Sequence, residues 1–493
     1  MGDTVTADDL CMMSLQGVSD LIRHRDCSAL EVTDAVLERI TSLDPILHTY
    51  ITVDEEGARQ AAEAADSAWA GGTSLGTLQG IPISVKDHFA VRGLRTTLAS
   101  KLFADYVPDF DAAIVERTRS AGAVVVGKTN MYELGSGWGT TGHFPLALNP
   151  WRSEYSPGGS SSGSAAAVAS GLCYASLASD GGGSVRVPSN YCGVVGLKPT
   201  HGRVSYYGSV PSLAGWGDKQ YVTSKTISAA GVIARRVEDV AIVLQTVAGW
   251  DRRDPGSEDV AVPDYVESLT GDVHGLVVGV LTDYIGRDIS RENAAAFEQA
   301  LSVFIEAGAR LRELQTPKTL DRIGWMWTTI AYVEMAALYG EQLETNEQSI
   351  GPEMQDRIKA GLGTLATEYF LATQARQALR AEWTEMFRDC DVIATPTAPA
   401  EPPTMAELKA RRSDLQNIGE LARYTRPYNM TGFPAITVPD GFSSAGLPLG
   451  LQLGGRPFDE ATILRAADAY ERRTAWHGKA PIRAASSYVN RPA

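Results

Sequence analysis

The chain has 493 residues, of which 44% are hydrophobic and 21% are charged. This balance is typical of a globular protein, and it excludes a fibrous repeat and long-range disorder. The net charge is −15 and no run of clustered Lys or Arg is present. Because such a surface repels phosphate backbones, we expect no nucleic-acid partner.

Five cysteines are spread widely along the sequence. Their odd number and spacing fit neither a disulfide framework nor a metal site, and they favour a reducing compartment. The first ten residues are acidic and lack an apolar signal core. No segment approaches the roughly 18 consecutive apolar residues that a membrane span requires. These features predict a cytoplasmic protein that does not associate with a membrane.

The hydrophobic pattern indicates helices that alternate with buried strands. Residues 1–70 carry apolar residues at helical spacing and many strong helix formers. Residues 163–179 are small and predict a helix packed close to its neighbours, and residues 236–386 are rich in helix formers. The expected strands are 80–87, 121–130, 193–200, 275–283, 391–397, 434–442 and 448–455. We therefore predict an α/β fold in one large domain.

Residues 122–129 match the phosphate-loop pattern G-x-x-x-x-G-K-[ST] letter for letter. A phosphate loop needs a flexible turn after a strand, so that backbone N–H groups can wrap the phosphates. Here the four middle residues, Ala-Val-Val-Val, are themselves strand-like, and no apolar strand precedes Gly122. The pattern therefore predicts a strand and no nucleotide site.

Residues 159–163 fit the G-x-S-x-G nucleophile elbow of α/β-hydrolases, with Ser161 as the nucleophile. That elbow must follow a strand, yet residues 149–158 are polar and interrupted by proline. No downstream histidine lies in a loop that suggests a Ser–His pair. A mechanism centred on Ser161 is therefore disfavoured.

Two glycine-serine loops and an upstream lysine form a more informative pattern. The loops cover residues 156–164 and 179–188, and Lys86 ends an expected strand. Three glycines before Ser184 allow consecutive backbone N–H groups to point into one concavity, as an oxyanion hole requires. A serine at the end of that loop can attack a carbonyl, and a buried lysine can act as its base. The three segments together contain the parts of an acyl transfer that needs no histidine.

These segments resemble the amidase signature family, the serine hydrolases with a Ser–cis-Ser–Lys triad. The resemblance rests on PGGSSSGSAAAVASG, SDGGGSVRVPSNYCGVVGLKPTHGR, GIPISVKDHFAVRGLRTT, AGAVVVGKTNMYELG and the late YNMTGFPAITVP. It extends from about residue 10 to 475 and is strongest over 78–205. It implies the amidase signature fold: a single α/β domain over 1–493, with a central mixed β-sheet covered by helices on both faces. The expected segments are a helical N-terminus (1–70), a signature core (71–235), a variable helix-rich part that shapes the substrate site (236–386) and closing strands with a helix (387–493).

The resemblance assigns a role to each matched position. Ser184 becomes the acyl-forming nucleophile, and Ser160, 24 residues earlier, becomes the bridging serine after a cis peptide bond. Lys86 becomes the base, and no cofactor or metal is implied. The backbone N–H groups of Gly181, Gly182, Gly183 and Ser184 are expected to form the oxyanion hole, with Asp180, Arg186 and Gly159 supporting the loops.

In the implied reaction, neutral Lys86 accepts a proton from Ser160, which accepts one from Ser184 as that serine attacks the substrate carbonyl. A lysine with an unperturbed pKa of about 10.4 is neutral only about once in 2,500 molecules at pH 7. Burial of Lys86 must therefore supply most of the necessary shift in pKa.

The expected substrate follows from two positions at which subclasses of the family differ. The glutamine-hydrolysing subunit of tRNA-dependent amidotransferases usually has an acid seven positions before the Asn of the late motif, and paired arginines near the substrate carboxylate. Here those positions hold Ala422 and the pair Asp356–Arg357. We therefore expect an amidohydrolase for small or aryl, uncharged amides, with carbamates (urethanes) as further substrates.

This expectation describes a monomer or homodimer that acts on a small-molecule amide. The alternatives are the glutamine-hydrolysing subunit itself and a non-enzymatic scaffold. The presence of Lys86, Ser160 and Ser184 together argues against the scaffold. The residues expected to line the substrate site are Tyr132, Trp138 and His143.

Overall fold

The computed structural model describes residues 6–137, 143–209, 226–410 and 417–482. Its α-helices are α1 (Ala7–Met12), α2 (Leu15–His24), α3 (Ala29–Leu47), α4 (Glu55–Ala70), α5 (Ala113–Ser120), α6 (Ser162–Ala169), α7 (Arg186–Cys192), α8 (Val237–Val247), α9 (Thr282–Ile285), α10 (Arg291–Glu306), α11 (Ile323–Asn346), α12 (Pro352–Leu362), α13 (Ala366–Met386), α14 (Met405–Ala410), α15 (Arg426–Thr431) and α16 (Glu460–Arg473). Its strands are β1 (Tyr50–Val53), β2 (Pro82–Lys86), β3 (Val124–Thr129), β4 (Ala175–Asp180), β5 (Val195–Lys198), β6 (Ala229–Ala234), β7 (Val277–Val280), β8 (Arg310–Glu313), β9 (Val392–Pro396), β10 (Ala435–Phe442) and β11 (Pro448–Gly454).

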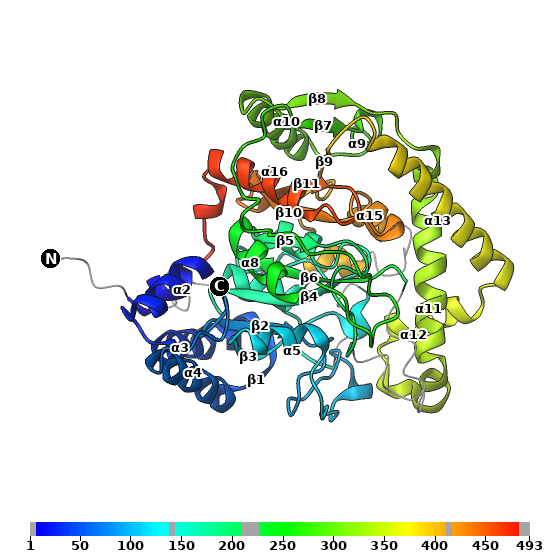
Figure 1. Ribbon diagram of the computed structural model, residues 1–493. Coiled ribbons are helices and arrows are strands. Elements are labelled where there is room, and N and C mark those ends of the chain that lie inside the picture. Colours follow the sequence, from blue (N-terminus) through cyan, green and yellow to red (C-terminus); the bar gives the residue numbers. More distant parts are fainter. Residues whose placement is uncertain (1–5, 138–142, 210–225, 411–416, 483–493) are drawn as a thin grey trace.

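The described strands form one sheet in the order β1-β3-β2-β4-β6-β5-β10-β11-β9-β7-β8, which runs through the whole molecule (Figure 1). The sheet is mixed, because β2 is parallel to β3 and β4 whereas β10 is antiparallel to β5 and β11. The pairing of β5 with β10 joins strands that are more than 200 residues apart in the sequence. One continuous sheet confirms the prediction of a single α/β domain with a central mixed sheet.

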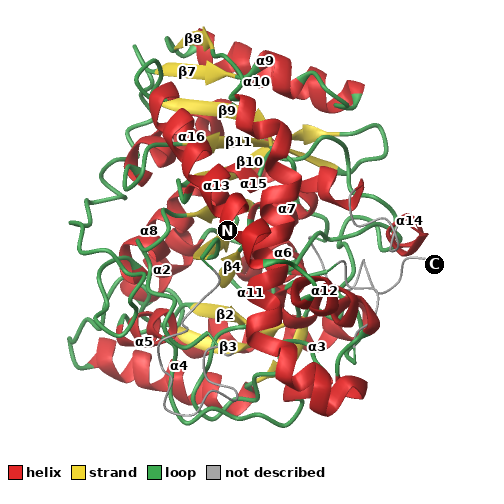
Figure 2. Cartoon of the chain, turned by 90° about the vertical axis from the view of Figure 1, so that its right-hand side faces the viewer, coloured by secondary structure: helices red, strands yellow, loops and turns green. Residues whose placement is uncertain are grey.

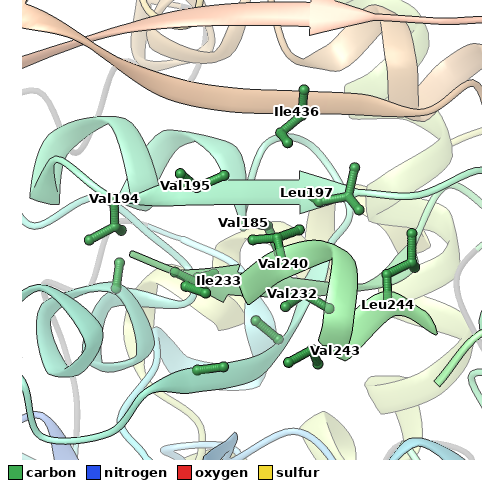
Figure 3. Packing of buried hydrophobic residues seen from close by; sticks show 14 of the residues in the cluster. Val185, Val194, Val195, Leu197, Val232, Ile233, Val240, Val243, Leu244 and Ile436 are labelled. Atoms are coloured by element: carbon green, nitrogen blue, oxygen red, sulfur yellow. The ribbon is translucent and has the colours of Figure 1, made fainter. Parts of the chain in front are cut away.

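Helices cover both faces of this sheet, as predicted: α8 and α16 lie on one side, and α6 and α7 lie on the other (Figure 2). On the α8 side, Val195 and Leu197 of β5 lie together with Val240 and Leu244 of the helix (Figure 3). All four side chains are fully buried. Burying a side chain of this kind stabilises the fold by about 1.5–3 kcal/mol, so this layer fixes the position of the central strands.

The structure differs from the predicted elements at four strands: β1, β4, β6 and β8. Strand β1 interrupts the N-terminal helices, and β4 occupies the end of the segment predicted as a close-packed helix. The β4 sequence, Ala-Ser-Leu-Ala-Ser-Asp, contains no β-branched residue, so local preference does not reveal a strand. Ladder pairing with β2 on one side and β6 on the other outweighs that preference.

Residues 124–129 form strand β3, so the prediction of a strand rather than a phosphate loop is confirmed. The lysine of the motif, Lys128, is fully buried, and its Nζ lies 3.0 Å from Oδ1 of Asp87. Its charge is therefore already paired within the protein. Across the described ranges, no helix combines the length and the apolar character that crossing a bilayer requires.

Candidate active site

The candidate site lies where two neighbouring parallel strands end. Lys86 is the last residue of β2 and Asp180 is the last residue of β4, and these strands pair in parallel. The carboxyl ends of parallel strands meet at the same sheet edge, which is where α/β proteins place their functional groups. The two glycine-serine loops follow at this edge, one before α6 and the other between β4 and α7.

Lys86 contacts one serine from each loop. Its Nζ donates to Oγ of Ser160 at 2.8 Å and to Oγ of Ser179 at 2.9 Å. The Lys86 side chain is fully buried and Ser160 is only 3% exposed. Burial disfavours the charged form of a lysine, so this arrangement can support proton exchange between Lys86 and Ser160. Sequence reasoning did not select Ser179, although it begins the second loop.

The first loop approaches an aromatic ring so closely that only glycine fits. The Gly159–Ser160 peptide bond is cis, as expected from the resemblance. A Cβ atom on Gly159 would lie 2.0 Å from the ring of Tyr132. The N–H of Tyr132 also donates to the Ser160 carbonyl at 3.0 Å. Tyr132, expected to line the substrate site, thus lies buried against this loop.

Ser161, the nucleophile of the disfavoured elbow, is fully buried and ties the two loops together. Its N–H donates to the Ser184 carbonyl at 3.3 Å, and its Oγ donates to the Ser179 carbonyl at 3.3 Å. Ser184 is partly exposed, in contrast. Of these two serines, Ser184 is therefore the one that a substrate can reach.

The backbone N–H groups of the second loop differ in whether they already have an acceptor within the protein. The N–H of Gly183 donates to Oδ1 of Asp180 at 2.7 Å, so Gly183 is not available to an oxyanion and the expectation for this residue is wrong. The backbone N–H groups of Gly181, Gly182 and Ser184 donate to no acceptor in the described part of the chain. Three of the four expected donors therefore remain free to face a substrate.

A buried ion pair holds this loop. Nη2 of Arg186 lies 2.9 Å from Oδ1 of Asp180, and both side chains are fully buried. Burial alone would raise the pKa of Asp180, but the Arg186 guanidinium outweighs it and holds that pKa well below its usual range. Asn429, from the late motif, donates to the Asp180 carbonyl at 2.9 Å and to Oδ1 at 3.0 Å. Asp180 and Arg186 thus brace the loop from within.

Two further residues that sequence reasoning did not select contact the same loop. The indole N–H of Trp327, from α11, donates to the Gly181 carbonyl at 2.8 Å. Oγ1 of Thr425 donates to the Gly182 carbonyl at 2.9 Å. Trp327 lies in an aromatic-rich stretch and Thr425 lies four residues before Asn429, but neither spacing indicates a contact with residues 181–182.

The other positions considered for the substrate site differ in burial and in their contacts. His143 is exposed and its ring packs edge-on against Phe144, and Trp138 lies outside the described residues. Arg357 is buried, and its charge is paired with Glu353 at 3.1 Å. Ala422 is buried one turn before Thr425, whose N–H donates to its carbonyl. The position of the expected acid is therefore beside the second loop, and it carries no charge.

Known proteins that resemble this chain cover it almost completely. The sequence profile of the family named Amidase matches residues 31–464. A Glutamyl-tRNA(Gln) amidotransferase subunit from Roseiflexus sp. (strain RS-1) is 39% identical over 96% of this chain and 98% of its own length. The structure of the subunit of the same name from Thermotoga maritima is 31% identical, with a TM-score of 0.77 over 94% of this chain and 95% of that one. The structure of 6-aminohexanoate cyclic dimer hydrolase with substrate has a TM-score of 0.84 at 27% identity, over 96% and 99% of the two chains.

These relatives correct the expectation for partners. We expected a monomer or homodimer that acts on a small-molecule amide without a nucleic-acid partner. Relatives that match 95–96% of this chain are instead named as subunits of a tRNA amidotransferase, and that finding overturns the simple expectation. The acidic composition was a poor guide, because the net charge of a single chain does not show which partners that chain has. The matched profile, the fold and the two glycine-serine loops together show that this chain belongs to the amidase signature family, as an enzyme that acts on carbon–nitrogen bonds.

Proposed function

We propose that the chain hydrolyses a carboxamide through an acyl-enzyme on Ser184. The observation that carries this proposal is the buried hydrogen bond from Lys86 Nζ to Ser160 Oγ. The residue that follows Ser160, Ser161, donates its N–H to the Ser184 carbonyl. Ser184 attacks the carbonyl carbon and passes its proton to Ser160, which passes a proton to neutral Lys86. The proton then returns to the leaving nitrogen, and water hydrolyses the acyl-enzyme.

The oxyanion of the tetrahedral intermediate binds to the N–H groups of Gly181, Gly182 and Ser184. Donors that are fixed before the reaction stabilise the developing charge without reorganisation, and one such donor contributes about 2.7–4 kcal/mol to catalysis. Asp180 and Arg186 act as positioning residues here, because they hold the backbone of the loop without facing the substrate.

The side-chain amide of glutamine is the substrate that the relatives favour. Relatives that are 38–39% identical over 95–96% of the chain are named as a subunit of Glutamyl-tRNA(Gln) amidotransferase. On this proposal the chain releases ammonia from glutamine as one subunit of a larger amidotransferase. Uncharged aryl amides and carbamates form the second candidate class, because Ala422 supplies no carboxylate for the ammonium group of glutamine.

The experiment has a labelling step and a substrate step. A fluorophosphonate probe should label Ser184, and Ser184→Ala should abolish labelling, whereas Ser161→Ala should retain it. Turnover of glutamine, a nitroanilide and an aryl carbamate is then measured with the chain alone and with the remaining subunits of such an amidotransferase from the same source. Labelling of Ser161 in place of Ser184 would overturn the mechanism. Faster turnover of the nitroanilide than of glutamine in both preparations would favour the second substrate class.

A further inference from the structure

A cavity of about 650 Å³ lies between α11 and the segment that precedes α15. Its volume suits a small organic substrate. Its lining includes Tyr332 of α11 and three arginines, Arg287, Arg423 and Arg426. The charges of these arginines determine what the cavity can bind.

Two of the three arginines already have carboxylate partners. Arg287 lies 2.8 Å from Asp321. Arg423 lies 3.8 Å from both Asp288 and Glu420. Three acids therefore lie beside these two arginines, so neither arginine needs an anion from outside.

Arg426 differs from both. It is 7% exposed, and its Nε is buried without a hydrogen-bond partner in the described part of the chain. Within the same ranges, no carboxylate lies within ion-pair distance of its guanidinium, which stacks 4.2 Å from the ring centre of Trp327. Burial lowers the pKa of Arg426 to about 10, so the side chain remains a cation at neutral pH. A buried cation without a partner is costly, and an anionic ligand would relieve that cost.

Arg426 also lies close to the candidate reaction centre. Arg426 stacks on the ring of Trp327, and the indole N–H of Trp327 donates to the Gly181 carbonyl. A Cβ atom on Gly182 would lie 2.8 Å from the same indole. The preceding residue, Thr425, donates to the Gly182 carbonyl. Arg426 and the loop that ends at Ser184 therefore both contact the indole of Trp327.

We propose that Arg426 binds a carboxylate group of the amide substrate and selects anionic amides over neutral ones. The inference rests on the proposed amide hydrolysis. A guanidinium binds a carboxylate through two parallel hydrogen bonds, which fixes the distance between that carboxylate and the amide at Ser184. Arg357 is committed to Glu353 and cannot serve in this way without breaking that pair.

The test compares two amides that differ in one charge: glutaramate, which has a carboxylate five carbons from its amide nitrogen, and its methyl ester. Ammonia release should give the natural chain a kcat/KM about 10- to 100-fold higher for glutaramate, the range expected for one charge-assisted interaction. Arg426→Met should bring this ratio close to one, and Arg426→Lys should retain part of it. Arg287→Met, which removes a paired arginine from the same cavity, should leave the ratio unchanged. An unchanged ratio in Arg426→Met would overturn the proposal.

A binding measurement separates this proposal from the proposed hydrolysis. Glutarate binding is measured by calorimetry on the Ser184→Ala chain, with and without Arg426→Met. Glutarate binding that disappears with Arg426→Met supports the anion site, whether or not the amides are turned over. Absence of turnover for both amides would count against the proposed hydrolysis but not against the anion site. Binding that is equally strong in both chains, or absent from both, would overturn the anion site.

Discussion

Replacing the carboxylate of Asp180 should destabilise the protein strongly. Asp180 accepts from Nε and Nη2 of Arg186 at 3.0 and 2.9 Å, from the N–H of Gly183 at 2.7 Å and from the N–H of Val185 at 3.1 Å. Asp180→Asn leaves the Arg186 guanidinium buried without a counter-charge. Breaking a buried pair in this way costs about 3–5 kcal/mol, so we expect the free energy of unfolding to fall by that amount.

The assay is denaturant unfolding followed by tryptophan fluorescence, under conditions where refolding is reversible. Asp180→Asn combined with Arg186→Met should cost less than the sum of the two single changes, because neither charge is then left alone. Arg388→Met is a control: it removes a surface pair with Glu385 at 3.0 Å and should cost less than about 1 kcal/mol. The pKa of Asp180 is depressed in the folded state, so the stabilisation by this pair should be lost as the pH falls below about 4. A loss below about 1 kcal/mol for Asp180→Asn at pH 7 would refute the reasoning.

Two further predictions concern proton transfer and pH. For Lys86→Ala, kcat/KM should fall at least about 100-fold, and the rise of kcat/KM toward alkaline pH should flatten, because the buried base is gone; a pH–rate profile checks this, and an unaltered rising limb would contradict it. Burial raises the pKa of Asp440 to about 8, while Tyr470 donates to this carboxyl. Because the folded pKa lies above the unfolded value of about 3.9, stability from Asp440 is lost as the pH rises from about 4 to 8. Asp440→Asn should therefore be more stable than the natural chain by at least about 1 kcal/mol at pH 8 and show little difference at pH 4, as measured by denaturant unfolding; a difference that does not vary with pH would count against the buried acid.

The strands that could be predicted are those whose own residues favour a strand. Strands β3 and β10 are rich in Val, Ile and Thr, and their positions follow from the sequence. Strands β4 and β6 are built largely from alanine, serine and glycine. They are strands because both of their edges are paired, and this information resides in the assembled sheet and not in the local sequence.

The same distinction applies to the site. Lys86 and Ser160 could be selected because each lies in a short motif, and the fold brings Nζ and Oγ to 2.8 Å. Trp327 lies more than 140 residues from the loop that it contacts, and Arg426, which stacks on Trp327, lies further along the chain. No periodicity in the sequence connects either residue to that loop. The N–H of Gly183 was expected to be free because a glycine run appears uniform in sequence. Only the position of Asp180 shows which of these N–H groups is already used.

The proposed catalytic residues and the residues proposed to select the substrate come from two different stretches of the chain, which also form different parts of the sheet. Among the described strands, β1 to β6 are contiguous in the sheet, and β5–β10 is the single junction with the strands that follow residue 276. Lys86, Ser160 and Ser184 all precede that junction in sequence. Trp327, which contacts the second loop, and Arg426, which lines the cavity, come after it. On the proposed mechanism, substitutions after the junction can therefore change which amide binds while Lys86, Ser160 and Ser184 stay in place. Descendants of one ancestral hydrolase could diverge in substrate without rebuilding their chemistry.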